Sequence, residues 1–222
     1  MNTIVITGAH GDIGNAILSA LRAPHTRLIG VVRDEATAKE VGQAQGIETV
    51  IADLGSYDAL LQLPSLLPET FDWLITAHGY IDPCTNPLQA LPQNTQQTFM
   101  VNALSQMYLV QLTASQLTRG MVCISSTAGI HANGKVLAYS ASKAAANALM
   151  QGLARNIESK TFIALCPGPT LGRMRESIGA SGGQSPELVG EACLKIIEGS
   201  YETKSGDIIT VKDGALETVA RI

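Results

Sequence analysis

A phenol and an ammonium group stand four residues apart in the segment LAYSASKAAANALM, as Tyr139 and Lys143. The Ala-rich composition predicts a helix, and residues four apart lie on the same face of a helix. An ammonium beside a phenol stabilises the phenolate and brings a tyrosine toward the working range of a general acid–base. Proton transfer is therefore the chemistry that we expect from this pair, although the same spacing also occurs by chance in helices without such a role.

Two further polar residues accompany the pair. Ser126 ends the apolar run GMVCISS, thirteen residues before Tyr139, and Asn102 lies in FMVNAL within a predicted helix at 94–118. Successive residues of a strand point to opposite faces, so Ser125 is expected to lie on the face opposite to Ser126 and to have a structural role.

A glycine-rich turn, TGAHGDIG, follows the first predicted strand. Glycine permits a tight turn and a close approach, and a helix N-terminus offers free N–H groups and a partial positive charge. The turn therefore predicts a pyrophosphate site, although any strand-to-helix turn can contain glycines. Its candidate contacts are Gly8, His10, Gly11, Asp12, Ile13 and Gly14. For His10, a solvated loop histidine is the alternative.

The residues after the second and third predicted strands are candidates for the adenosine half of a dinucleotide. Arg33 follows the strand in GVVRDE, where an arginine pairs with a 2′-phosphate, so NADP(H) is favoured over NAD(H). A plain surface charge is the alternative for Arg33, and Asp34 and Glu35 suit the first turn of a helix. Asp53 is placed to accept from an adenine amino group, or else to act as an N-terminal cap near Ser56.

Short apolar runs alternate with longer helical segments along the whole chain. The runs are rich in β-branched residues, as in strands buried on both faces, and span 3–7, 26–32, 47–52, 71–77, 120–126, 160–166 and 206–211. The helical segments are 12–22, 34–45, 56–66, 94–118, 138–158 and 186–198. This alternation predicts an α/β fold: a Rossmann-like, doubly wound parallel sheet of about seven strands with helices on both faces, in a single domain spanning 1–222. In such sheets ligands bind beyond the carboxyl ends of the strands.

The composition limits the possible partners. The net charge is −4 and the 15 basic residues are scattered, which argues against nucleic acid and against an anionic membrane surface. No apolar run approaches the ~20 residues of a membrane span, no leader peptide is recognisable and no pattern of metal ligands occurs, so we expect a soluble, cytoplasmic protein without a metal. The four separated cysteines are expected to be reduced and mostly buried.

At this point the sequence resembles the short-chain dehydrogenase/reductase family over nearly its whole length. The resemblance rests on the glycine turn, Asp53-Leu54, Asn102, Ser126, Tyr139-Ser-Ala-Ser-Lys143, CPGPT and the closing SGDIITVKDG. It implies that Tyr139 exchanges a proton with the substrate oxygen, that Ser126 orients that oxygen, that Lys143 supports Tyr139 and binds the nicotinamide ribose, and that Asn102 holds a relay water. It further implies cofactor contacts from Leu54, Ala77, Gly79, Pro167, Gly168 and Thr170.

Three departures from the family pattern stand out. Asp12 occupies the second glycine position of the usual TGxxxGxG turn, and the resulting spacing is closer to the family's extended, sugar-nucleotide-modifying branch. TAHG, with His78, replaces the usual NNAG and removes side chains that support the central strands. After the PG turn, Thr170 and Gly172 replace the usual Val and Thr, so the contact to the carboxamide comes from Thr170 or from main chain only.

The substrate is not identified by the sequence. The loop 170–186 is expected to fold over it, with Arg173 and Arg175 as contacts to an anion or as solvated side chains, and with His78, Tyr80, His131 and Asn133 as further lining candidates. The leading interpretation is an NADP(H)-dependent oxidoreductase acting on a small carbonyl/alcohol pair. The alternatives are an epimerase or dehydratase with tightly bound cofactor, and a non-catalytic NADP(H)-binding sensor. By the resemblance, the helices 94–118 and 138–158 pair with another subunit in a homodimer or homotetramer.

Overall fold

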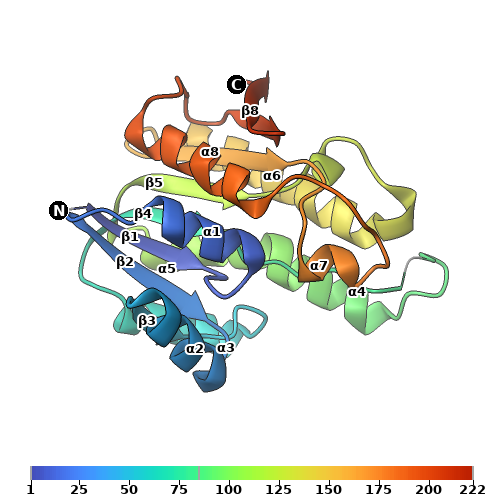
Figure 1. Cartoon of the computed structure of the whole chain (residues 1–222), viewed down its shortest axis with the longest axis horizontal. Coiled ribbons are helices and arrows are strands. Elements are labelled where there is room, and N and C mark those ends of the chain that lie inside the picture. Colours follow the sequence, from blue (N-terminus) through green and yellow to red (C-terminus); the bar gives the residue numbers. More distant parts are fainter. Residues whose placement is uncertain (1, 85, 222) are drawn as a thin grey trace.

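A single eight-stranded sheet forms the centre of the protein in the computed structural model, which describes residues 2–84 and 86–221 (Figure 1). The strand order is β3-β2-β1-β4-β5-β6-β7-β8, and all neighbours are parallel except β7 and β8. The strands are β1 Asn2–Thr7, β2 Thr26–Val32, β3 Glu48–Ile51, β4 Phe71–Thr76, β5 Leu117–Ile124, β6 Thr161–Pro167, β7 Ile208–Lys212 and β8 Ala215–Ala220. The prediction of a Rossmann-like, doubly wound α/β sheet is confirmed, with β8 as an antiparallel edge strand that the sequence analysis did not foresee.

Helices cover both faces of the sheet. They are α1 Asp12–Ala20, α2 Glu35–Gln45, α3 Tyr57–Leu66, α4 Pro92–Phe99, α5 Ser105–Thr113, α6 Leu137–Asn156, α7 Arg173–Glu176 and α8 Pro186–Glu198. One apolar core lies between the sheet and α1, α2 and α8, and the other lies between the sheet and α3, α5 and α6. In Figure 1, α1 and α8 lie in front of the sheet, whereas α5 and α6 lie behind it.

Local sequence signals set several of the helix ends. The side chain of Asp34 accepts a hydrogen bond from the Thr37 N–H at the start of α2, and Ser56 does the same for Ala59 at the start of α3. Gly46 ends α2 in the left-handed conformation, at φ 60°. Because β1 to β7 run parallel, the turns that follow these strands, and hence the polar residues in them, lie at one edge of the sheet.

The predicted helix 94–118 is wrong in detail. It is divided into α4, a π-helical turn at Met100–Leu104 and α5, and it ends at Thr113. Leu117, at its predicted end, instead begins β5 and pairs with Phe71 of β4. Pairing across the sheet, rather than local helix propensity, decides the structure at that end.

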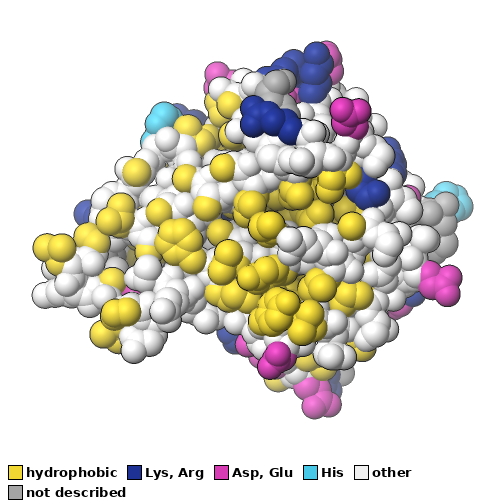
Figure 2. Space-filling model, turned by 180° about the vertical axis from the view of Figure 1, so that it is seen from behind, with side chains coloured by type: hydrophobic (Ala, Val, Ile, Leu, Met, Phe, Trp, Pro, Cys, Tyr) yellow, Lys and Arg dark blue, Asp and Glu magenta, His cyan; other side chains and the backbone are white. Residues whose placement is uncertain are grey.

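Apolar side chains gather on the face that carries α3, α5 and α6 (Figure 2). Large apolar residues that remain exposed there are Tyr57, Leu61, Leu104 and Met107. An exposed apolar patch of this kind is typical of a surface that contacts another protein.

Candidate active site

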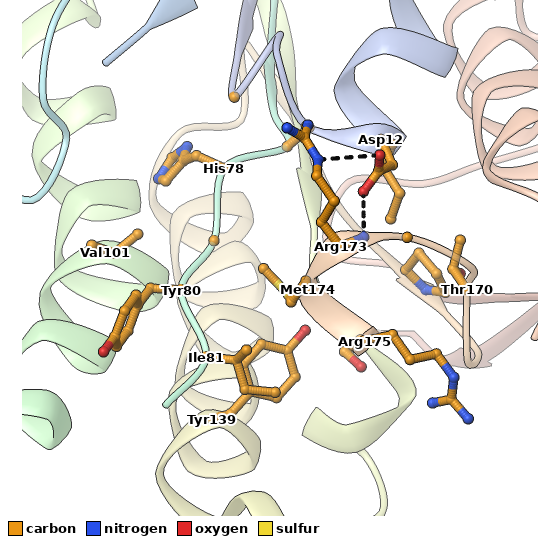
Figure 3. Close-up of a pocket in the computed structure, with 18 of the residues that line it drawn as sticks. Asp12, His78, Tyr80, Ile81, Val101, Tyr139, Thr170, Arg173, Met174 and Arg175 are labelled. Carbon is orange, nitrogen blue, oxygen red and sulfur yellow. Dashed lines mark hydrogen bonds and ion pairs between the residues drawn. The ribbon is translucent and has the colours of Figure 1, made fainter. Parts of the chain in front are cut away.

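A cleft of about 800 Å³ opens beyond the carboxyl ends of the parallel strands. It brings together fifteen of the predicted site residues: Gly8, His10, Gly11, Asp12, Ile13, Arg33, Asp53, Leu54, Ala77, Gly79, Ser126, Tyr139, Pro167, Gly168 and Thr170. The three others, Gly14, Asn102 and Lys143, are buried next to it. Figure 3 shows the part of the cleft around Tyr139, with Asp12 and Arg173 at one end.

The glycine turn between β1 and α1 has no room for a side chain at Gly8 or at Gly14. Gly8 has φ 68°, and a Cβ at Gly8 would lie 2.5 Å from the main-chain nitrogen of His78. A Cβ at Gly14 would lie 2.1 Å from the Gly8 carbonyl oxygen. Gly11 begins α1 without a side-chain cap, so the helix N-terminus faces the cleft as an anion site. These features fit the pyrophosphate of a dinucleotide.

At the adenosine end of the cleft, Arg33 is exposed over 77% of its side chain, and its Nε lies 3.5 Å from an Asp34 oxygen. Asp34 is held by α2, because its other carboxylate oxygen accepts hydrogen bonds from Thr37, and these bonds lower the pKa of Asp34. Asp53 accepts from the Gly55 N–H at 2.9 Å. Ser56, and not Asp53, caps α3, which removes the alternative role considered for Asp53. His10 likewise has a partner of its own, with Nε2 3.1 Å from a Glu40 oxygen.

Tyr139 lies in the first turn of α6 and lines the cleft. The Lys143 ammonium, on the next turn, lies 5.7 Å from the centre of the Tyr139 ring and donates to the Ile124 carbonyl at 2.9 Å. Only 3% of Lys143 is exposed. The ammonium is therefore fixed next to the phenol by the carboxyl end of β5. In Figure 3 the Tyr139 hydroxyl points to the space below Met174.

Ser126 lies two residues beyond the end of β5, not within the strand as the sequence suggested. Its Oγ accepts from the Ala128 N–H at 3.1 Å, which caps a short 3-10 turn, and the residue lines the same cleft as Tyr139. Ser125 is buried and donates to the Lys143 carbonyl, so its contact joins β5 to α6.

Asn102 lies in the π-helical turn and is fully buried. Its Oδ1 accepts from the Tyr80 N–H and its Nδ2 donates to the Tyr80 carbonyl, both at 2.8 Å. Nδ2 also lies 2.9 Å from Ser142 Oγ. Asn102 thereby ties the segment after β4 to α6, close to both Tyr139 and Lys143. Short π-helical turns are frequent at functional sites.

His78 forms a buried network that the sequence analysis did not foresee. Its Nδ1 lies 2.6 Å from Thr7 Oγ1 and its Nε2 lies 2.8 Å from Ser105 Oγ. The amide nitrogen of Gln106 lies 3.2 Å from Nε2. Burial, with a smaller effect of the Lys143 charge, lowers the pKa of His78 to about 3. A neutral imidazole therefore joins β1, β4 and α5 at the position where the family pattern has NNAG.

The segment after β6 closes over the cleft. Thr170 Oγ1 donates to the Gly168 carbonyl at 2.9 Å and accepts from Gln184 Nε2 at 3.4 Å. The Leu171 N–H also donates to the Gln184 carbonyl, so side-chain and main-chain contacts together hold this turn. Arg173 Nε lies 3.5 Å from Asp12 Oδ1, and the Arg173 N–H donates to Asp12 Oδ2 at 2.9 Å. The sequence analysis missed the apolar lining residues Ile81, Val101, Val136, Met174 and Ile178. Apolar residues in loops and helices give no signal that separates them from the core.

The described cysteines have no disulfide partners. Burial raises the pKa of Cys123, and it raises the pKa of Cys166 and of Cys193 to about 12. Cys84 is partly exposed, and its thiol donates to the Asn86 carbonyl. Within residues 2–84 and 86–221, no group of three potential metal ligands occurs and no helix is long and apolar enough to cross a bilayer.

A doubly wound sheet with a glycine turn at its first helix and a cleft beyond the strand ends defines a dinucleotide-binding protein. The family model described as short chain dehydrogenase matches residues 2–182. The chain therefore belongs to the short-chain dehydrogenase family, whose members are oxidoreductases that bind a nicotinamide cofactor and act on alcohol and carbonyl groups of small molecules.

Solved structures show the same fold at low sequence identity. A short-chain dehydrogenase/reductase from Mycobacterium ulcerans has a TM-score of 0.85 and 18% identity, over 96% of this chain and 89% of that chain. A glucose/ribitol dehydrogenase-type protein from Brucella melitensis has a TM-score of 0.86 and 20% identity, over 96% of each chain. BdcA in complex with NADPH has a TM-score of 0.82 and 23% identity, over 97% of this chain and 96% of that chain. Among curated protein sequences nothing matches.

Proposed function

We propose that the protein is an NADP(H)-dependent oxidoreductase that interconverts a small carbonyl compound and its alcohol, with residues 1–222 working as one domain. The observation that carries this proposal is the placement of Tyr139 on the wall of the cleft that also contains the glycine turn, with the Lys143 ammonium 5.7 Å from its ring centre. An acid–base group and a dinucleotide cradle then share one cavity.

Each catalytic side chain has a distinct task in this proposal. The Tyr139 hydroxyl gives a proton to the carbonyl oxygen during reduction and takes it back during oxidation. Ser126 donates a hydrogen bond to the same oxygen and orients it. Lys143 supplies the positive charge that stabilises the phenolate between the two steps, and its bond to Ile124 keeps that charge in place.

Asn102 links Tyr139 and Lys143 to the rest of the site. Both of its amide atoms bind the main chain of Tyr80, and its contact with Ser142 reaches α6 between the two reactive residues. We assign to this turn the relay water through which the proton reaches solvent. The π-helical turn would expose main-chain groups of 100–104 for that purpose.

The residues present fit a nicotinamide dinucleotide, because Gly8 and Gly14 allow a tight main-chain turn at the wall of the cleft and α1 begins there without a side-chain cap. The pyrophosphate would lie on Gly8–Gly14 and the adenine near Asp53 and Leu54. The remaining contacts would come from Ala77, Gly79, Tyr139, Lys143, Pro167, Gly168 and Thr170. When bound, the nicotinamide supplies or accepts the hydride.

NADP(H) is favoured over NAD(H) because Arg33 is exposed at the end of β2. Its guanidinium contacts Asp34 through Nε at 3.5 Å, and its other nitrogens can pair with a phosphate. BdcA, which has the same fold, was solved with NADPH. His10, on the glycine turn, is a second candidate for a phosphate contact.

In this proposal the protein acts as a homodimer or homotetramer in the cytoplasm, without nucleic acid or a membrane as partner. The apolar patch of Tyr57, Leu61, Leu104 and Met107 on the face of α3, α5 and α6 supports the assembly. Light scattering tests it, and a single monomeric species at micromolar concentration would contradict it.

The function is tested by titrating the purified protein with NADPH and with NADH and by following nicotinamide absorbance over a panel of aldehydes and ketones. We expect tighter binding of NADPH, turnover of at least one carbonyl, and a loss of about 10²–10⁴-fold in kcat for Tyr139→Phe at unchanged NADPH affinity. A non-catalytic sensor would bind NADPH without any turnover. An epimerase would convert substrate without net consumption of NADPH.

A further inference from the structure

The end of the cleft around Tyr139 shows which charge a substrate can carry. Two cationic side chains of the described lining lie at this end, and both belong to the segment after β6: Arg173 and Arg175. If either guanidinium were free, it would favour an anionic substrate. Their hydrogen-bond partners therefore decide the question.

Arg173 is engaged by the glycine turn. Its Nε lies 3.5 Å from Asp12 Oδ1, its Nη2 donates to the His10 carbonyl at 2.5 Å, and its N–H donates to Asp12 Oδ2 at 2.9 Å. Figure 3 shows the side chain extended toward Asp12 and away from Tyr139. The approach is close, since a Cβ at Gly172 would lie 2.4 Å from Asp12 Oδ2. Asp12 and the His10 carbonyl thus hold the Arg173 side chain in a direction away from Tyr139.

Arg175 is engaged by its own loop. Its Nε donates to the Gly182 carbonyl at 2.6 Å, and its Nη2 donates to the Ser181 carbonyl at 2.8 Å. Both contacts close the segment that follows α7. In Figure 3 the guanidinium points away from the Tyr139 hydroxyl. This arginine therefore shapes the loop and leaves the space at Tyr139 to other side chains.

The remaining wall near Tyr139 is mainly apolar. Ile81, Val136, Met174 and Ile178 line it, and the Met174 methyl lies 3.3 Å from where a Cβ of Gly79 would be. The polar residues Tyr80, Ser126, His131 and Asn133 also line the cleft. The Lys143 ammonium, 5.7 Å from the Tyr139 ring centre, is buried and donates to the Ile124 carbonyl. A carboxylate in this space would therefore lose its water without gaining a cationic partner that is not already engaged, which is costly.

We propose that the substrate is a neutral, largely apolar carbonyl compound or alcohol, and that Asp12 is a residue that determines this specificity by binding Arg173. The inference rests on the proposed oxidoreductase function. It also gives a role to the carboxylate that stands where the family pattern has glycine.

Matched pairs of α-keto esters and their free α-keto acids test the charge preference, with phenyl, linear and branched side chains, at saturating NADPH. The assays run at one fixed pH for both members of each pair. We expect kcat/KM for the methyl ester to exceed that for the acid by about tenfold or more, since a site without a partner for a charged group rejects it. Equal or preferred use of the acids would overturn the proposal.

Asp12→Asn tests the role of the carboxylate, because it removes the negative charge paired with Arg173 while keeping the side-chain size. The ester-to-acid ratio of kcat/KM is expected to fall by about threefold or more, as the acid gains a partner. The ratio cancels any change in NADPH binding. Glu40→Gln is the matched control: it removes a carboxylate that contacts His10 and not Arg173, and it should leave the ratio unchanged. An unchanged ratio in Asp12→Asn would show that Asp12 does not set specificity.

Binding separates this inference from the proposed reaction. If none of the ketones is reduced, the proposed reaction fails, and calorimetric titration of the NADPH-loaded protein with the same pairs still measures the charge preference. Tighter binding of the esters supports a neutral substrate. Equal or tighter binding of the acids, or no binding of any ester, overturns it.

Discussion

The imidazole of His78 lies between the ends of β1 and α5, with Nδ1 2.6 Å from Thr7 Oγ1 and Nε2 2.8 Å from Ser105 Oγ. Burial lowers the pKa of this ring to about 3, so the folded protein keeps it neutral at pH values where the unfolded chain protonates it. The ring is fully enclosed by the strands that carry the cofactor turn and the segment with Gly79. A residue at the centre of the site therefore makes the stability of the whole protein depend on pH.

Acid should destabilise the protein through His78. From about pH 6.5 down to about pH 3 the unfolded chain binds a proton that the folded state refuses, so the free energy of unfolding should fall by up to about 1.4 kcal/mol per pH unit. Above pH 6.5 both states are neutral and this contribution is constant. Urea unfolding of His78→Asn, followed by circular dichroism, should show a shallower decline over the acid range. The exposed His25→Asn is the control and should keep the wild-type slope; equal slopes for both variants would remove His78 as the cause.

Gly14→Ala should damage the cofactor turn. The new Cβ would lie 2.1 Å from the Gly8 carbonyl oxygen, so the turn must move. We expect a loss of about 1–3 kcal/mol in stability and a tenfold or larger increase in the Kd for NADPH. Fluorescence titration and thermal melting measure the two effects. In Gly134→Ala the Cβ meets nothing within 4 Å, and both quantities should stay near wild type.

Lys143→Met should impair proton transfer more than cofactor binding. Without the buried ammonium the phenolate loses its stabilising charge, so kcat at neutral pH should fall by about 10²-fold or more while the Kd for NADPH changes less. Steady-state kinetics and fluorescence titration measure the two effects. Lys135→Met removes an exposed lysine nearby and should leave both quantities near wild type. A kcat of Lys143→Met equal to that of wild type would rule out the electrostatic role.

Arg33→Ser should change the cofactor preference. A guanidinium paired with a 2′-phosphate contributes a charge-assisted bond, so NADPH affinity should fall by about tenfold or more while NADH affinity changes little. Parallel titrations with the two cofactors give the ratio, in which general folding effects cancel. An equal loss for both cofactors would mean that Arg33 contacts something common to them.

Much of the fold follows from local features of the sequence. The β-branched runs 26–32 and 71–77 match β2 and β4 almost residue for residue, because strands buried on both faces need continuous apolar segments. The end of the helix predicted at 94–118 was wrong, because 113–117 has no glycine or proline and only pairing with β4 makes Leu117 a strand residue. The strand β8 was missed for a similar reason: alternating exposure along an edge strand gives a weak pattern.

In the candidate site too, local features could be predicted from the sequence and contacts between distant residues could not. The glycine turn and Tyr139 could be found because their chemistry is confined to a few neighbouring residues. The contact between Asp12 and Arg173 joins residues 161 positions apart, and neither residue by itself predicts that the other is its partner. The network of His78 is equally non-local, since Thr7 and Ser105 come from two other elements. Such contacts are properties of the folded chain and leave no periodic trace in the sequence.

The π-helical turn at Met100–Leu104 has a consequence for how this region can vary. The widened turn holds one residue more than an α-helical turn would, so α4 and α5 are out of phase with each other. Removing a single amino acid there would rotate α4, which contributes Gln97 to the wall of the cleft, by roughly 100° while α5 stays packed against the sheet. A change in length of one residue at this point would therefore reorient that wall of the cleft without disturbing the packing of the sheet.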